Sequence, residues 1–212
     1  MENNTYKEKL AEQLLQIKAI QLNTTEPFTW ASGIKSPVYC DNRKLLSYPE
    51  IRNMVKNGLV SLLNEYFPQT ECIAGVATAG IPHGALIADA LNLPFVYVRS
   101  KPKEHGLTNM IEGDLKHGQR VLVVEDTIST GGSSLKAAND LRAAGAEVIG
   151  MIAIYKYGFE SAKKRFEDEG VILKTLTNYD FLIRVAQEKK YINAEEIATL
   201  QQWRQNPTTW KP

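Results

Sequence analysis

The sequence carries almost no net charge and has no long apolar run. It has 212 residues, with 25 Lys and Arg against 24 Asp and Glu, giving a net charge of +1. That balance gives no electrostatic reason to expect binding to nucleic acid or to a membrane surface. The most apolar region, residues 72–98, is interrupted by prolines and polar residues, so it does not predict a membrane span. The first ten residues, MENNTYKEKL, lack the apolar core of a signal peptide, and we expect a cytoplasmic protein.

Cysteine and histidine are also scarce. The two cysteines, Cys40 and Cys72, each lie in a strand-like stretch, and we expect free thiols rather than a disulfide. The three histidines, His83, His105 and His117, do not have the spacing of zinc ligands. The sequence therefore gives no reason to expect a disulfide framework or a protein-held zinc ion.

Strand and helix patterns alternate from residue 72 onward. Apolar, β-branched runs predict strands at 72–77, 95–99, 121–124, 148–155 and 171–176, and periodic apolar positions predict helices at 81–91, 135–144 and 159–169. This alternation is typical of an α/β fold with a parallel, doubly wound sheet flanked by helices. At this length we expect a single domain, residues 1–212. Such sheets bind ligands beyond the carboxyl ends of their strands.

The first 45 residues do not fit this alternation. Residues 28–30 and 38–40 predict two short strands, and a turn is expected between them. We interpret residues 1–45 as a small cap over the sheet, which we call the hood.

Three segments match the capping box, a helix-starting motif in which a capping side chain and a Glu three residues later exchange hydrogen bonds. They are Thr5-x-x-Glu8, Ser47-x-x-Glu50 with Pro49 between, and Asn193-x-x-Glu196. Each predicts the start of a helix.

One stretch, RVLVVEDTISTGGSS at residues 120–134, combines features of a ligand site. A buried strand is followed by Glu125 and Asp126, then by a loop of small, hydroxylated and glycine residues that leads into a helix. Backbone N–H groups in such a loop, together with the helix dipole, favour an anion. Two adjacent carboxylates can accept hydrogen bonds from a vicinal diol or face a hydrated Mg²⁺.

This stretch has other possible interpretations. Gly131 and Gly132 alone suit any strand-to-helix turn of an α/β protein. No Lys follows the glycines as in a P-loop, and the G-x-G-x-x-G dinucleotide fingerprint is absent. A phosphorylated sugar therefore fits the stretch better than ATP or NAD.

Two further segments add to this picture. Residues 75–84 form a second glycine-rich turn at a strand's carboxyl end, which suggests a ligand with two separated phosphate groups. The connection from 99 to 119 is polar and longer than a normal link, and predicts a functional lid or a β-hairpin. It carries Lys101, Lys103 and His105, and it is either a solvated surface loop or, as we favour beside an anion site, a mobile cationic loop.

These residues carry a resemblance to a known family. VLVVEDTISTGG resembles the signature of the type I phosphoribosyltransferases, which bind 5-phosphoribosyl-1-diphosphate (PRPP). The hood motif, Phe28-Thr29-x-x-Ser32-Gly33-x-Lys35-Ser36-Pro37, and the loop motif, Arg99-x-x-x-Lys103-x-His105-Gly106, are similar to those of the orotate phosphoribosyltransferases. The likeness runs from about the first helix to Ala186.

The resemblance implies a reaction, a cofactor and an assembly. Orotate and PRPP would give orotidine 5′-monophosphate and diphosphate, a step of de novo pyrimidine (UMP) biosynthesis that uses Mg²⁺. Mg²⁺ would be held mainly by PRPP, with Asp126 nearby and no direct protein ligand. The family also implies a homodimer in which each loop closes on the neighbouring subunit's site.

The resemblance also implies roles for individual residues. Residues that would bind PRPP are Thr78, Gly80, Arg99, Lys103, His105, Glu125, Asp126, Thr127, Ile128, Ser129, Thr130, Gly131, Gly132 and Ser133. Catalytic roles would fall to Arg99, Lys103, His105 and Asp126, with Lys103 meeting the growing charge of the diphosphate. Orotate would contact Ser129 and backbone groups of Val38 and Tyr39.

The sequence departs from the family pattern at several positions. Many members have Lys where Ala31 and Ala79 stand, and some have a second basic residue where Ser100 stands. The family's orotate-contacting Arg after the next strand has no clear match, although Lys156 lies close to that place in the sequence. The partner of the orotate carboxylate is therefore left open.

Two alternative functions were considered. A purine phosphoribosyltransferase would share the signature, but the hood motif favours orotate. A PRPP-sensing regulator that binds nucleic acid would need a basic surface or an added DNA-binding domain, and the net charge of +1 argues against it.

Overall fold

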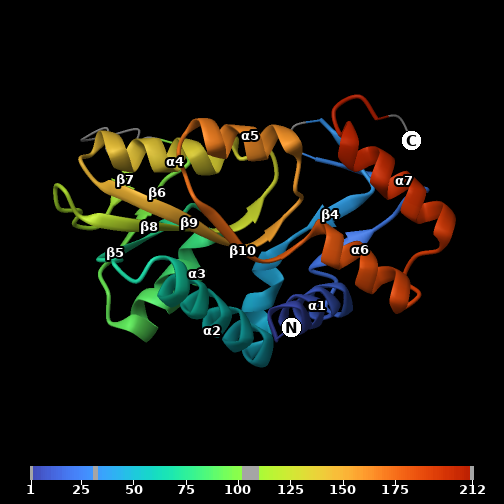
Figure 1. Ribbon diagram of the computed structural model, residues 1–212, viewed down its shortest axis with the longest axis horizontal. Coiled ribbons are helices and arrows are strands. Elements are labelled where there is room, and N and C mark those ends of the chain that lie inside the picture. The colour runs from blue at the N-terminus through green and yellow to red at the C-terminus, as the bar shows by residue number, and fades with distance from the viewer. Residues whose placement is uncertain (1, 31–32, 102–109, 211–212) are drawn as a thin grey trace.

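The computed structural model describes residues 2–30, 33–101 and 110–210, and is built around one six-stranded sheet (Figure 1). The strand order is β10-β9-β8-β5-β6-β7. Five strands are parallel: β5 (Cys72–Val76), β6 (Phe95–Val98), β8 (Arg120–Ile128), β9 (Glu147–Lys156) and β10 (Leu173–Asn178). The sixth, β7 (Ile111–Glu112), runs antiparallel at one edge.

Helices cover both faces of this sheet. Helices α4 (Gly132–Ala143) and α5 (Glu160–Asp168) lie on one face, and α2 (Pro49–Tyr66) and α3 (Gly80–Leu91) lie on the other (Figure 1). Successive residues of β8 alternate between two buried clusters, because side chains of a strand point to opposite faces. Both faces are therefore buried, as the continuous apolar run at 121–124 predicts. The predicted parallel, doubly wound sheet is confirmed.

Strand β8 is longer than the sequence predicted. Glu125 and Asp126 were expected to end the strand, but they lie inside it. The reason is that β9 continues to pair beside them, with Thr127 opposite Tyr155 and Ile128 opposite Lys156. The pairing holds both carboxylate-bearing residues on a rigid strand rather than on a loop.

Only one of the three predicted capping boxes forms. Asn193 caps α7 (Ala194–Gln205) with a complete capping box. At Thr5 the predicted helix is present but the capping box is not, because α1 (Glu2–Gln16) already begins at Glu2 and places Thr5 inside the helix. At Ser47 the predicted helix is present but the capping box is not: the 3₁₀ helix η1 (Asn42–Ser47) includes that residue, and α2 begins at Pro49 with no side-chain cap.

The hood contains two small antiparallel sheets. Strand β1 (Ile20–Leu22) pairs with β4 (Val38–Cys40), and β2 (Phe28–Thr29) pairs with β3 (Lys35–Ser36). The two strands predicted here are present, but each pairs with a strand that the sequence did not indicate.

The C-terminal helices lie beside the hood. Helix α6 (Tyr179–Glu188), which was not predicted from the sequence, packs against α1, and α7 lies next to it (Figure 1). The indole Nε1 of Trp203 in α7 donates to the carbonyl of Lys35 at 3.1 Å. The hood is thus held by side chains from the other end of the chain.

The two ends of the long connection after β6 pair with each other as the base of a β-hairpin. Strands β6 and β7 are antiparallel, and the backbone N–H of Arg99 donates to the carbonyl of Met110 at 2.8 Å. The hairpin prediction is confirmed at this base. The predicted site residues Lys103 and His105 lie outside the described residues.

Cys40 and Cys72 are free thiols, as predicted. Within the described part of the chain, no helix has the length and apolar character needed to cross a membrane.

Candidate active site

The glycine-rich loop after β8 and the glycine-rich turn after β5, each predicted to bind a phosphate group, are called the two cradles. The first of them enters α4 through a turn that only glycine fits. Gly131 caps α4 with φ of +79°, a conformation that other residues rarely adopt. A Cβ at this position would also lie 2.8 Å from a ring carbon of Phe166. No side chain among the described residues caps the N-terminus of α4, so its first backbone N–H groups remain available to an anion.

The second glycine-rich turn lies directly against β8. A Cβ on Gly80, the first residue of α3, would lie 2.4 Å from the carbonyl oxygen of Val124. Only glycine allows this approach, which brings the start of α3 next to Glu125. Thr78, exposed in the turn before it, follows a cis peptide bond from Ala77. The two predicted cradles are therefore neighbours, because β5 and β8 are adjacent strands.

Glu125 is buried and engaged within the protein. Its side chain is 6% exposed; Oε1 accepts from the backbone N–H of Asp126 at 3.0 Å, and Oε2 accepts from the hydroxyl of Ser134 at 3.1 Å. Burial, and then the neighbouring charge of Asp126, raise the pKa of Glu125 well above its usual value. No local pattern in the sequence indicates that Ser134 holds this carboxyl group.

Asp126 is half-buried and takes part in a different network. Its Oδ2 accepts from the hydroxyl of Thr127 at 3.1 Å. The same hydroxyl accepts from Nδ2 of Asn42 at 2.9 Å and lies 3.5 Å from Sγ of Cys40. Residues of the hood and of η1 thus reach the strand that carries the predicted catalytic carboxylate.

His83 lies on α3 near this carboxylate but does not act as a charged partner. The imidazole is 2% exposed, and burial lowers its pKa to about 4, although the charge of Asp126 opposes this shift. His83 is therefore neutral near pH 7. Its Nε2 has no hydrogen-bond partner among the described residues.

Arg99 is held at the base of the hairpin. Its guanidinium lies 3.2 Å from Oε1 of Glu112, and both side chains are partly exposed. A role on diphosphate would require the guanidinium to exchange this carboxylate for the ligand. Because both groups are solvated, the existing ion pair is weak enough to permit that exchange.

The predicted base contacts in the hood are already engaged in part. The carbonyl of Val38 accepts from the hydroxyl of Ser36 at 2.7 Å and from the indole of Trp30 at 3.2 Å. The N–H of Val38 donates to Ser36 at 3.1 Å. Tyr39 pairs with Gln21 of β1, and its ring lies 5.5 Å from that of Phe28. This arrangement leaves the half-exposed Tyr39 side chain as the more accessible group.

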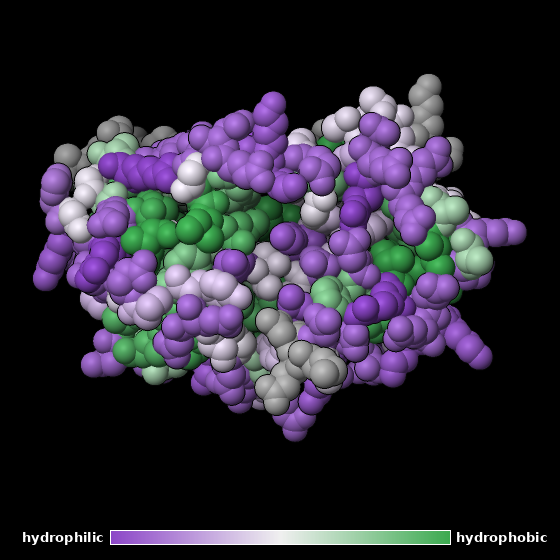
Figure 2. Space-filling view, viewed as in Figure 1, coloured by the Kyte–Doolittle hydropathy of each residue, from purple (hydrophilic) through white to green (hydrophobic). Residues whose placement is uncertain are grey.

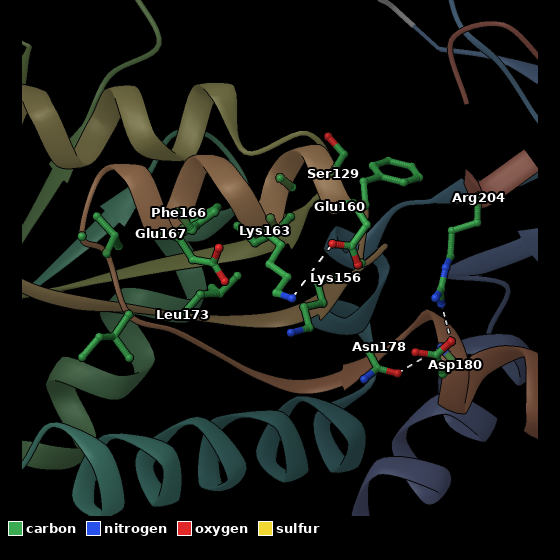
Figure 3. A pocket seen from close by; sticks show the side chains of 17 residues that line it. Ser129, Lys156, Glu160, Lys163, Phe166, Glu167, Leu173, Asn178, Asp180 and Arg204 are labelled. Carbon is green, nitrogen blue, oxygen red and sulfur yellow. Dashed lines mark hydrogen bonds and ion pairs between the residues drawn. The ribbon is translucent and has the colours of Figure 1, made fainter. Parts of the chain in front are cut away.

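A separate pocket of 580 Å³ lies between α5 and the β10 edge of the sheet (Figure 3). Its apolar lining includes Phe166 and Leu173 (Figure 3). On the same side of the molecule, an apolar band lies below the hydrophilic side chains at the top of the view (Figure 2). Lys156 and Lys163 project into the pocket, and Ser129 lies at one end (Figure 3). None of the described hood residues lines this pocket, although Ser129, which is also expected to contact orotate, does.

Replacing Lys156 by alanine tests whether it binds the orotate carboxylate. We expect kcat/KM for orotate to change by no more than about twofold, because the pocket of Lys156 does not include Val38 or Tyr39 of the hood. Initial rates at varied orotate would measure this, with Lys190→Ala as a control on an exposed lysine. A tenfold or larger rise in KM would instead place Lys156 in the orotate site.

The remaining donor set suits magnesium carried by a substrate. No group of three or more His, Cys, Asp or Glu in the described ranges could hold a metal ion alone. Asp126 offers a half-buried carboxylate with one oxygen bonded to Thr127. Mg²⁺ is commonly bound through one or two carboxylates together with substrate phosphates, so the residues present fit an ion carried by PRPP.

Comparison with known proteins gives the family. A profile described as "Phosphoribosyl transferase domain" matches residues 44–189. The orotate phosphoribosyltransferase of Bacteroides fragilis is 60% identical over 201 residues, covering 95% of each chain. That of Cytophaga hutchinsonii is 54% identical over 206 residues, covering 97% of this chain and 99% of its own.

A solved structure agrees with these relatives. The crystal structure of orotate phosphoribosyltransferase from Aeropyrum pernix superposes with a TM-score of 0.75 at 29% identity, covering 87% of this chain and 99% of that one. Sequence and fold thus give the same assignment over nearly the whole chain. The chain belongs to the phosphoribosyltransferase family, and within it to the orotate phosphoribosyltransferases.

Proposed function

We propose that this chain transfers the 5-phosphoribosyl group of PRPP to orotate, giving orotidine 5′-monophosphate and diphosphate. The reaction is a step of de novo pyrimidine (UMP) biosynthesis. The observation that carries the proposal is the adjacency of two glycine-dependent anion cradles, at the ends of β5 and β8, in a chain 54–60% identical to orotate phosphoribosyltransferases.

The two cradles divide the phosphates of PRPP between them. Residues Thr127 to Ser133 and the N-terminus of α4 bind the 5′-phosphate through backbone N–H groups and the helix dipole. The turn from Thr78 to Gly80 binds the diphosphate. The ribose then lies between them, in front of Asp126.

Asp126 stabilises positive charge rather than attacking the sugar. Departure of diphosphate leaves an oxocarbenium-like ribosyl centre, which a nearby carboxylate favours. Orotate is already an anion at neutral pH, so the attack needs no strong general base. Glu125 has both oxygens bonded within the protein, and we assign it to supporting the strand end and the ribose hydroxyls.

The leaving group is met by the cationic loop. Lys103, Arg99 and His105 would surround the diphosphate as its charge grows, with Arg99 released from Glu112. Mg²⁺, when bound with PRPP, would neutralise part of that charge. A loop closed over the site would also exclude water, which otherwise hydrolyses PRPP.

Orotate would lie between Ser129 and the hood. Its contacts in the hood would be backbone groups of Val38 and Tyr39. We further propose a single domain with residues 1–45 as the hood, acting as a homodimer whose loops are exchanged between sites. Two free cysteines agree with a reducing cytoplasm as the location.

A panel of bases tests the proposal. Purified protein with PRPP and Mg²⁺ should consume orotate and leave adenine, hypoxanthine and xanthine unchanged, measured by chromatography of the nucleotide products. Turnover of a purine without turnover of orotate would replace the proposal with a purine phosphoribosyltransferase.

A further inference from the structure

Asn42 is a buried side chain that joins the hood to the predicted catalytic strand. It is the first residue of η1, and none of its surface is exposed. Its Nδ2 donates to the carbonyl of Asp126 at 3.2 Å and to the hydroxyl of Thr127 at 2.9 Å. Its Oδ1 has no partner among the described residues. The two bonds donated by Nδ2 are therefore the ones that offset the free-energy cost of burying this amide.

The bond to the Asp126 carbonyl fixes which way round the amide lies. A backbone carbonyl can only accept a hydrogen bond, so the amide atom beside it must be the nitrogen. The same nitrogen therefore also donates to Thr127.

The direction of the next bond follows from this. A threonine hydroxyl has one proton and two lone pairs. Because the Thr127 oxygen accepts from Asn42, its single proton is free to point at Oδ2 of Asp126, 3.1 Å away. The chain of hydrogen bonds thus runs in one direction, from Asn42 through Thr127 to Asp126.

We propose that Asn42 is a positioning residue that orients the Asp126 carboxylate through Thr127. The idea rests on the proposed function, in which Asp126 faces the ribosyl centre. A carboxylate held by a donated hydrogen bond keeps its charge and its orientation before the substrate arrives. Its interaction with the cationic centre grows in the transition state, so the loss should appear mainly in kcat.

Four variants separate this role from general packing. Asn42→Ala removes the donor, and Thr127→Val removes the relay while keeping its shape. Asn42→Asp can only accept from Thr127, so it turns the hydroxyl proton away from Asp126. Thr127→Ser retains the hydroxyl and should restore activity. Asn57→Ala, at an exposed asparagine on α2, is the matched control.

In a double-mutant cycle of Asn42→Ala and Thr127→Val, we expect the losses in kcat not to add. Asn42→Ala and Thr127→Val should each lower kcat about tenfold, with little change in KM for PRPP, as for loss of a hydrogen bond to a charged group. The double variant should lose about the same tenfold, because both changes break one chain. Thr127→Ser should recover most of the kcat lost in Thr127→Val, and Asn57→Ala should stay near wild type. A hundredfold loss in the double variant, or normal kcat in Asn42→Asp, would overturn the proposal.

A second readout does not need the proposed reaction. Nitrogen-15 NMR of the free protein follows the side-chain NH2 group of Asn42, with its signals assigned through Asn42→Ala. None of the Asn42 surface is exposed and Nδ2 donates to Asp126 and Thr127, so these protons should exchange slowly with solvent. Thr127→Val removes one of the two acceptors and should speed this exchange. Exchange in wild type as fast as at the exposed Asn57 side chain would refute the chain, whichever base the enzyme uses.

Discussion

Replacing Lys103 by alanine is expected to slow turnover by about 10²–10³-fold while leaving the fold intact, as for loss of one donor to a developing charge. The diphosphate gains negative charge as its bond to ribose breaks, and Lys103 is the cation that the sequence motif assigns to it. The base of its hairpin forms through backbone pairing at Arg99 and Met110, which does not depend on the Lys103 side chain. Steady-state kcat with orotate measures the effect, and circular dichroism checks the fold.

Lys101→Ala is the matched control, because Lys101 is an exposed lysine of the same loop. Its kcat should stay near that of wild type. Near-normal turnover of Lys103→Ala would remove Lys103 from the mechanism. Equal losses in both variants would show that the loop acts through its total charge.

Mixing two inactive variants tests whether the site is shared between subunits. Lys103→Ala chains keep Asp126, and Asp126→Asn chains keep Lys103, so each hybrid dimer has one site with both residues. Random exchange should restore about a quarter of the wild-type sites in a two-fold dimer. The turnover rate after exchange, verified by mass spectrometry, measures this. No recovery would count against loops exchanged between sites.

Replacing Trp203 by alanine is expected to lower the free energy of unfolding by about 3–5 kcal/mol, as for other buried large aromatic side chains. The indole is fully buried, and its ring centre lies 5.5–5.9 Å from those of Trp30, Tyr157, Phe159 and Tyr179. It also donates to the carbonyl of Lys35, so the change leaves a cavity and an unpaired carbonyl under the hood. Urea unfolding followed by circular dichroism measures the loss.

Two further variants give this prediction a control. Trp203→Phe keeps most of the ring contacts and should lose clearly less stability than Trp203→Ala. Tyr191→Ala removes an aromatic side chain that is 48% exposed and should change stability by no more than about 0.5 kcal/mol. A loss below that size in Trp203→Ala would show that α7 does not hold the hood.

The sheet was predictable because its signals are local. The run at 121–124 is apolar on both faces, and each following helix has its own periodicity, so strand order along the chain needed no long-range information. The limits of β8 were not predictable in this way. Pairing with β9 carries the strand through Glu125 and Asp126, whose side chains alone suggest a strand end.

The side chains that hold Glu125 and Asp126 in place could not be predicted either, because they too depend on contacts between distant parts of the chain. Asn42 lies 85 residues before Thr127, and only the folded chain brings their side chains together. Ser134 was counted among the residues of the loop, yet its hydroxyl holds Glu125. Helix α6 could have been predicted from a local pattern, because the side chain of Asn178 caps it by accepting from the N–H groups of Asp180 and Phe181. The strand pattern at 171–176 ends just before this cap, and no helix was predicted after it.

The most direct test of the account is the stoichiometry of the reaction in the presence of Mg²⁺. Protein given equal amounts of PRPP and orotate should form one orotidine 5′-monophosphate and one diphosphate for each PRPP consumed. Asp126→Asn assayed beside it should form far less of both. PRPP that disappears without consuming orotate, or a mixture that stays unchanged with folded protein, would contradict the assignment of this site as an orotate phosphoribosyltransferase centre.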